Sequence, residues 1–176
     1  MSMVNVAGKN ATTKLSNIDE DMIQPNAVDI RLDKVFEISN NLFVIDAANN
    51  KQHRGSTEMQ PDEEGFFHLE PNKMYEYVSS SGIKVGPDEA GWVIGRSSAL
   101  RNGVQILSCL YDSCYHGSIM GTIVVYNGPA KIQRGTRIGQ YVSLKAEALK
   151  AYNGSYGYGK EYDKKYGTTA ESQNLK

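Results

Sequence analysis

The chain has 176 residues, which is long enough for one domain with a packed core. Its 19 basic and 20 acidic residues give a formal net charge of −1, so it lacks the positive field that drives sequence-independent binding to nucleic acid. No apolar run approaches the roughly 18 residues that cross a bilayer, and residues 1–10 contain no apolar signal core. We therefore expect a soluble, cytoplasmic protein that binds neither nucleic acid nor membrane.

The chain divides into a polar arm (1–22), a β-rich body (23–150) and a tail (151–176). Short β-rich runs recur in the body between Gly, Pro, Asn and Asp, which favours an all-β barrel or sandwich over βαβ units. Residues 46–65 are polar and predict a loop, and residues 97–102 predict one brief helix before Gly103. The expected strands are Val28–Ile38, Leu42–Ile45, Phe66–Leu69, Met74–Val78, Trp92–Ile94, Val104–Leu110, Thr122–Tyr126, Ala130–Ile132 and Ile138–Leu144.

The tail is rich in glycine, tyrosine and lysine, and residues 152–167 hold five of the chain's 11 tyrosines. A segment so short and glycine-rich cannot form its own core, so it is either disordered or folds over another part of the molecule. Cys109 and Cys114 predict two part-buried reduced thiols, because a single Cys-x4-Cys pair is a poor zinc pattern. Trp92 is expected in the barrel core and His116 on an exposed turn.

Two segments combine charged residues with a strand. In IQPNAVDIRL, the alternation from Val28 to Leu32 predicts a half-buried strand whose other face carries Asp29, Arg31 and Asp33. In GRSSALR, Arg96 and two hydroxyls follow an apolar strand and open a helical turn. Free N–H groups, hydroxyls and a guanidinium fork suit phosphate oxygens. A capping pair with a surface arginine would produce the same pattern.

Two further segments lie later in the chain. In LYDSCYHG, Asp112 ends an apolar strand, three residues before Tyr115 and five before Gly117. An aspartate at a strand end is often a turn former, but it can also hold and deprotonate a water or bond a sugar hydroxyl. The segment QRGTRIGQ, which ends at Gln140, leads into the last long strand, and a purely structural hairpin would explain it equally well.

Together and in this order, the four segments resemble the motifs of the dCTP deaminase / dUTPase family over about 120 residues of the chain. The resemblance implies an all-β, distorted and jelly-roll-like barrel with one short helix and a flexible C-terminal lid. It also implies a homotrimer with active sites shared between subunits. The ligand would be a deoxyribonucleoside triphosphate that chelates Mg²⁺, with no direct side-chain ligand to the metal.

The family contains two chemistries, and one position separates them. The deaminases of the family carry a glutamate three residues before the asparagine that ends the strand after the third motif. Here that asparagine is Asn127, and the matching position is Val124. An aliphatic side chain cannot move a proton, so the sequence disfavours deamination and favours dUTP diphosphatase activity.

The resemblance assigns a role to each matching residue. Asp112 matches the catalytic aspartate that contacts the sugar 3′-hydroxyl and the attacking water, and Tyr115 matches the aromatic that packs on the deoxyribose. The strand around Gln105 and Ser108 would read the uracil edge, largely through backbone groups. The residues that match phosphate-binding positions are Arg96, Ser97, Ser98 and Gln140.

Two departures from the family pattern concern the tail and the strand after Gly117. The family's tail motif contains an arginine and a stacking phenylalanine, whereas this tail offers Tyr156 or Tyr158 for stacking. Lysine would replace the arginine without its guanidinium fork; the candidates are Lys160, Lys164 and Lys165. The strand after Gly117 is two residues longer than the common pattern, which suggests a bulge or a widened hairpin.

The leading hypothesis is therefore a dUTP diphosphatase that uses Mg²⁺. One alternative is a dCTP deaminase, or a diphosphatase of dCTP or a modified pyrimidine nucleotide, on the same fold. The second alternative is a non-catalytic nucleotide-binding regulator, which would bind nucleotide without releasing pyrophosphate.

Overall fold

The computed structural model describes residues 11–160 of the chain. Its helical segments are η1 (Glu20–Met22) and α1 (Ser97–Arg101). Its strands are β1 (Lys14–Leu15), β2 (Val28–Ile38), β3 (Val44–Ile45), β4 (Lys51–Gln52), β5 (Ser56–Glu58), β6 (Phe66–Leu69), β7 (Lys73–Lys84), β8 (Glu89–Gly95), β9 (Val104–Leu107), β10 (His116–Val125), β11 (Ala130–Gln133) and β12 (Arg137–Lys145).

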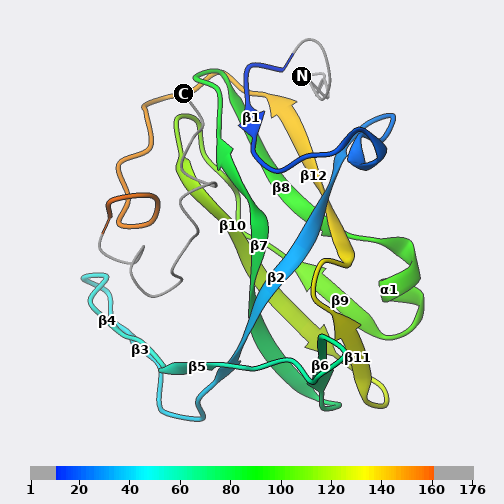
Figure 1. Cartoon of the computed structure of the whole chain (residues 1–176). Coiled ribbons are helices and arrows are strands. Elements are labelled where there is room, and N and C mark those ends of the chain that lie inside the picture. The colour runs from blue at the N-terminus through cyan, green and yellow to red at the C-terminus, as the bar shows by residue number, and fades with distance from the viewer. Residues whose placement is uncertain (1–10, 161–176) are drawn as a thin grey trace.

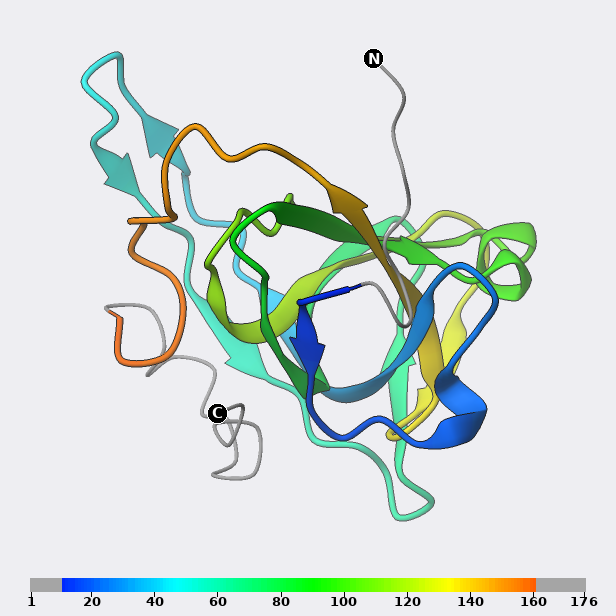
Figure 2. The same cartoon turned by 90° about the horizontal axis from the view of Figure 1, so that it is seen from above.

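Six strands close into a β-barrel in the order β7-β10-β9-β8-β12-β2, and β2 pairs back with β7. Every pairing is antiparallel, and β1 and β5 extend the sheet beyond the ring at β7 and β2. Seen from above, the strands enclose a ring (Figure 2). The expected all-β barrel with one short α-helix is confirmed, and α1 follows β8 where the sequence predicts it (Figure 1).

The barrel encloses one main hydrophobic core, built from alternate residues of the long strands. Full burial of such side chains stabilises the fold by roughly 1.5–3 kcal/mol each. The largest side chains with almost no exposed surface are Tyr75, Tyr77, Phe67, Met22, Ile30, Leu32, Leu69, Ile83, Ile119 and Ile123. Trp92 was expected among them but is only half-buried, because Gly91 and Val93 occupy the inward positions of β8.

Several strand boundaries differ from those expected. β7 and β10 extend well beyond the predicted 74–78 and 122–126, and β9 ends at Leu107 rather than at residue 110. The predicted loop 46–65 contains β4 and β5. β3 and β4 form a small hairpin that projects from the barrel (Figure 1), so the apolar run at 42–45 is exposed.

The pairing of β10 with β7 is irregular between Ser118 and Met120. Ser118 faces Gly82 and Met120 faces Val78, so Ile119 stands opposite three residues of β7. The irregularity expected after Gly117 is therefore present, and the additional residues belong to the partner strand β7. A bulge of this kind bends the sheet locally and re-aims the side chains beside it.

The N-terminal arm is attached to the barrel through Glu89, whose side chain is buried. The Glu89 carboxylate accepts the backbone N–H of Thr12 at 2.6 Å and of Thr13 at 2.7 Å, as well as both threonine hydroxyls. Burial raises the pKa of Glu89, but these hydrogen bonds outweigh it and hold the pKa below its ordinary value. The arm is therefore fixed by a charged acceptor, which is a strong class of hydrogen bond.

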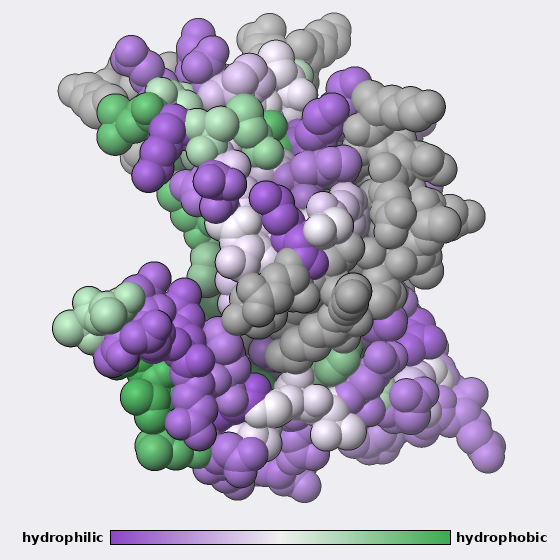
Figure 3. Space-filling model, turned by 90° about the vertical axis from the view of Figure 1, so that its left-hand side faces the viewer, coloured by the Kyte–Doolittle hydropathy of each residue, from purple (hydrophilic) through white to green (hydrophobic). Residues whose placement is uncertain are grey.

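Among the described residues visible in Figure 3, hydrophilic ones predominate, and the hydrophobic ones gather mainly along the left-hand edge. Within residues 11–160, no helix is long and apolar enough to cross a membrane.

Candidate functional site

Asp112 lies in a tight turn between β9 and β10. The turn closes where the N–H of Tyr115 donates to the carbonyl oxygen of Asp112 at 3.0 Å, and Cys114 adopts a left-handed conformation with φ of 66°. The buried hydroxyl of Ser113 donates to the carbonyl oxygen of Glu89 at 2.7 Å. The backbone of the turn is thus held on both sides. The Asp112 carboxylate is exposed, and it has no hydrogen-bond partner among the described residues.

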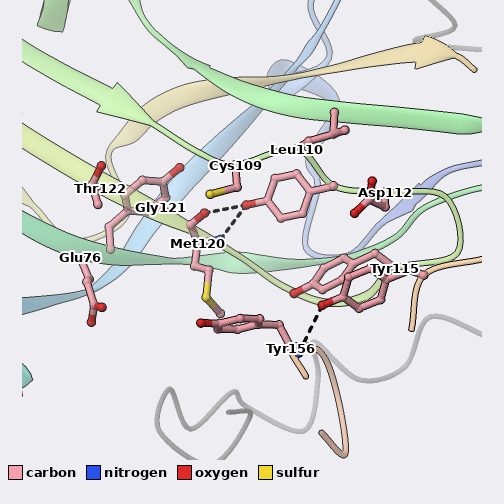
Figure 4. A pocket seen from close by; sticks show the side chains of 12 residues that line it. Glu76, Cys109, Leu110, Asp112, Tyr115, Met120, Gly121, Thr122 and Tyr156 are labelled. Carbon is pink, nitrogen blue, oxygen red and sulfur yellow. Dashed lines mark hydrogen bonds between the residues drawn. The ribbon is translucent and has the colours of Figure 1, made fainter. Parts of the chain in front are cut away.

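A cavity of about 320 Å³ lies beside Asp112 (Figure 4). One lip is the segment 109–112, and the other is the segment 120–122 of β10. The cavity is therefore the open mouth of the hairpin that β9 and β10 form. Its lining residues are Glu76, Tyr77, Cys109, Leu110, Tyr111, Asp112, Tyr115, Met120, Gly121, Thr122, Tyr152 and Tyr156.

Three tyrosines pack against one another beneath the turn. The ring centroids of Tyr111 and Tyr115 are 5.5 Å apart, and the Tyr152 ring meets Tyr115 edge-on at 5.3 Å. The hydroxyl of Tyr115 donates to the carbonyl oxygen of Ser118 at 3.0 Å. Tyr115 is therefore fixed by packing and by a hydrogen bond, as a platform beside Asp112 must be. Burial raises the pKa of Tyr111 well above its ordinary value, so its hydroxyl stays protonated.

The segment after β12 returns to this hairpin within the same chain (Figures 1 and 2). The N–H of Tyr152 donates to the carbonyl oxygen of Ser113 at 3.0 Å, and the N–H of Tyr158 donates to that of His116 at 2.9 Å. Tyr156 lines the cavity. A second cavity of about 610 Å³ lies between Asp112 and the segment 146–154. Residues 152–158 therefore lie against the outside of the Asp112 hairpin.

His116 is not on an exposed turn, as the sequence suggested, but at the start of β10. It is half-buried, its Nε2 atom is buried and has no hydrogen-bond partner within residues 11–160, and the Tyr158 ring meets it edge-on at 4.9 Å. Burial, followed by the positive charge of Lys84, lowers the pKa of His116. The imidazole is therefore neutral at pH 7. Lys160 is exposed at the end of the described segment, and Lys164 and Lys165 lie outside the described residues.

A second cluster surrounds Asp29 on β2. Its carboxylate is completely buried, although the alternation of the strand predicted a solvent-facing side chain. One oxygen accepts the side-chain N–H of Gln140 at 3.0 Å, and the other lies 3.7 Å from Arg96 and 3.6 Å from Arg137. A buried carboxylate is tolerated here because two guanidinium groups neutralise it. Arg137 also pairs with Asp21 at 3.4 Å, which joins the cluster to η1.

The cluster brings Arg96 and Gln140 together next to the first turn of α1, where Ser97 and Ser98 are exposed. Arg96 is the N-cap residue of α1, and its guanidinium, which has only donor groups and so cannot cap the helix, lies beside the Asp29 carboxylate. Sequence reasoning did not select Arg137, although the alternating motif RGTRIGQ contains it.

Two other expected residues have contacts elsewhere. The Gln105 side chain accepts the hydroxyl of Tyr126 at 2.6 Å. The hydroxyl of Ser108 accepts the N–H of Val93 at 2.8 Å and donates to the carbonyl oxygen of Cys109 at 2.9 Å. Neither side chain lines the cavity beside Asp112.

On one chain, the Asp112 cavity and the Asp29 cluster are separate. None of the cavity-lining residues beside Asp112 comes from the set Arg96, Ser97, Ser98 and Gln140. A ligand that contacts both groups would therefore have to reach beyond the cavity or receive one group from another copy of the chain.

Some cavity residues carried no functional signal in the sequence. Glu76 of β7 faces Thr122 of β10 in the strand pairing, and its carboxylate accepts the hydroxyl of Ser56 at 2.9 Å. Only the register of β7 against β10 brings Glu76 to the cavity. Val124, at the position that separates the two chemistries, pairs with Met74 and Gln105 and carries no titratable group.

Cys109 and Cys114 are free thiols, as expected, but both are exposed rather than part-buried. Cys109 lies on the rim of the cavity beside Asp112. Among residues 11–160, no three histidine, cysteine or acidic side chains come together as a metal site.

Two proteins resemble this chain in sequence over most of its length. The deoxyuridine 5′-triphosphate nucleotidohydrolase of Methanocaldococcus jannaschii is 30% identical over 142 residues, which cover 80% of this chain and 90% of that protein. A protein of Rhodococcus opacus, named dCTP deaminase, dUMP-forming, is 34% identical over 166 residues, which cover 89% of this chain and 86% of that protein.

Solved structures share the fold at low sequence identity. The 2′-deoxycytidine 5′-triphosphate deaminase of Agrobacterium tumefaciens superposes with a TM-score of 0.57 at 18% identity, over 78% of this chain and 45% of that one. The dUTPase of Staphylococcus bacteriophage 80alpha, solved with dUPNHPP, gives a TM-score of 0.50 at 12% identity, over 87% and 94% of the two chains. The family model described as dCTP deaminase-like matches residues 5–145. With the four motifs in order on a closed barrel, that match places this chain in the dCTP deaminase-like family, whose members include both dUTPases and dCTP deaminases.

Proposed function

We propose that the protein is a dUTP diphosphatase that converts dUTP and water to dUMP and pyrophosphate. The proposal rests on two residues considered together. Asp112 is exposed on a turn whose backbone is fixed, and the position of the deaminase glutamate is occupied by the aliphatic Val124. The first group can accept a proton from water, and the second cannot move a proton at all.

Asp112 would hold the attacking water and accept its proton. The water oxygen forms a bond to the α-phosphorus, and the bond from that phosphorus to the bridging oxygen breaks, which releases pyrophosphate. The turn supports this role because its backbone is held by Tyr115 and Glu89 while its carboxylate remains exposed. Tyr115 would pack on the deoxyribose, where a 2′-hydroxyl would be crowded.

The Asp29 cluster would bind the phosphates. Arg96 and Gln140 are held together by one buried carboxylate, and the exposed hydroxyls of Ser97 and Ser98 lie next to Arg96. Mg²⁺ chelated by the triphosphate would neutralise phosphate charge. The chain itself would supply guanidinium, amide and hydroxyl donors that fix the position of the triphosphate.

Because the Asp112 cavity and the Asp29 cluster are separate on one chain, we propose a homotrimer in which neighbouring subunits supply the two halves of each site. The segment 152–158 would exclude bulk water from the Asp112 half, with Tyr156 facing the cavity.

A pyrophosphate and ammonia assay with Mg²⁺ on dUTP and dCTP tests this proposal. We expect pyrophosphate from dUTP and no ammonia from dCTP. Ammonia release from dCTP would establish a deaminase instead, and nucleotide binding without either product would establish a regulator. Size-exclusion chromatography with light scattering tests the trimer independently of activity.

A further inference from the structure

The hairpin of β9 and β10 is open at its end nearest Asp112. The two strands pair regularly from Val104 with Val125 to Leu107 with Thr122. Continued in the same register, the next hydrogen-bonded positions would place Cys109 opposite Met120. The pairing instead stops at Leu107, and the segment 108–110 diverges from β10.

The hydroxyl of Tyr111 makes the hydrogen bonds to Met120 that β9 would make if its pairing with β10 continued. It donates to the carbonyl oxygen of Met120 at 2.6 Å and accepts the N–H of Met120 at 2.9 Å (Figure 4). In an antiparallel strand, the N–H and C=O of one residue point to the same side. Both polar groups of Met120 therefore point across the gap toward β9, and a single phenol satisfies them.

The backbone of Tyr111 is fixed on the opposite side of the gap. It forms an isolated bridge with Gly91 of β8, with hydrogen bonds of 2.7 Å and 3.1 Å. The ring is buried against Tyr115 and Tyr141, with centroids 5.5 Å and 6.1 Å away. Tyr111 thus spans the gap: its backbone is bonded to β8 and its hydroxyl to β10.

The cavity beside Asp112 is this gap. Its lips are Cys109 and Leu110 on one side, and Met120, Gly121 and Thr122 on the other. A closed ladder would fill the gap with backbone, whereas an open gap without Tyr111 would leave the N–H and C=O of Met120 without partners. Backbone groups that are shielded from water and left unpaired are unfavourable, so the mouth would tend to close or distort.

We propose that Tyr111 is a positioning residue that determines pyrimidine binding: its hydroxyl holds the Met120 peptide away from β9 and keeps the base cavity open. The inference rests on the proposed function only for the identity of the nucleotide. Because both polar groups of Met120 are already bonded to Tyr111, the base edge must be read by the remaining backbone of the lips.

The variant Tyr111→Phe tests the proposal, because it keeps the ring packing and removes only the hydroxyl. Its matched control is Tyr75→Phe, since the buried Tyr75 hydroxyl also bonds backbone, accepting the N–H of Glu70 at 2.9 Å, but lies outside the cavity. We expect hydrogen exchange at the Met120 amide to accelerate about tenfold or more in Tyr111→Phe and to stay unchanged in Tyr75→Phe.

Binding is measured by calorimetry with non-hydrolysable imido analogues of dUTP and dCTP. We expect the Kd of the better analogue to rise about tenfold in Tyr111→Phe. In the reaction that the wild-type protein catalyses, the variant's KM should rise by a larger factor than its kcat falls. Equal Kd values for wild type and Tyr111→Phe would overturn the inference, and so would equal losses in the two variants.

Pyrophosphate release tests the proposed function, and the binding of the analogues tests the role of Tyr111. A wild-type protein that binds an analogue but releases no pyrophosphate refutes the diphosphatase, while the Kd comparison still decides the role of Tyr111. A wild-type protein that binds neither analogue overturns the inference as well.

Discussion

The N–H of Tyr152 donates a hydrogen bond of 3.0 Å to the carbonyl oxygen of Ser113, the residue that follows Asp112. The C-terminal segment is thereby attached directly to the turn that presents the proposed catalytic carboxylate. Since Ser113 also bonds the backbone of Glu89 through its hydroxyl, one short turn joins the lid, the barrel and the N-terminal arm.

Asp112→Asn is expected to lower kcat for dUTP by roughly 10²–10⁴-fold, because the amide cannot accept a proton from the attacking water. The exposed side chain has no bonding partner among the described residues, so the melting temperature should stay within about 1 °C of wild type. Steady-state pyrophosphate release measures the effect. Asp88→Asn, an exposed aspartate outside the cavity, is the control and should keep wild-type turnover. Wild-type rates in Asp112→Asn would rule out the assignment.

Arg96→Lys is expected to raise the KM for dUTP about tenfold with a smaller effect on kcat. Lysine keeps the charge but loses the planar fork that can contact Asp29 and a phosphate together. Arg101→Lys, at the exposed end of α1, is the matched control and should behave as wild type. An unchanged KM in Arg96→Lys would place the phosphates elsewhere.

Gly157→Ala is expected to detach the lid and to lower kcat/KM for dUTP. A Cβ at position 157 would lie 2.5 Å from the carbonyl oxygen of His116, and the residue has a φ of +114°. Gly159→Ala is a close control, because that glycine also has a positive φ of +74° but no atom within 4 Å of the added Cβ. Kinetics and limited proteolysis of the tail should separate the two variants. Equal kinetics in both would show that tail closure does not contribute to turnover.

Glu89→Gln is expected to destabilise the protein at neutral pH and much less in acid. The folded-state pKa of Glu89 lies below its ordinary value of 4.5. The carboxylate therefore contributes stability above about pH 5, and this contribution is lost as the pH falls through the lowered pKa. Melting temperatures of wild type and Glu89→Gln between pH 3 and pH 7 measure the difference. A gap that widens toward acid would contradict the prediction.

Much of the fold and part of the site follow from local sequence. Alternating apolar residues between turn formers indicate the long strands of the barrel, and the order of the four motifs indicates the family. Asp112 and Tyr115 are found together because they belong to one turn, and residues within a turn are brought together by the backbone itself.

The remainder depends on strand register and on partners distant in sequence. Glu76 reaches the cavity because three residues of β7 stand opposite Ile119; the length of the strand after Gly117 suggests a bulge, but it does not reveal that the additional residues belong to β7. Asp29 is buried against the alternation of β2 because Arg96 and Arg137, far along the chain, neutralise it. Tyr111 resembles an ordinary core aromatic until the end of β9 is known.

The strand order of the barrel also determines when the barrel can close during synthesis. β12, near the end of the barrel sequence, pairs with β2, near its start, and β2 completes the ring by pairing with β7. During synthesis, the ring cannot be completed until residue 145 has left the ribosome, so the early strands must wait with open edges. Such non-local pairing is slow to form and exposes strand edges to other chains. The protein is therefore most open to pairing with other chains in the interval before β12 has joined β2.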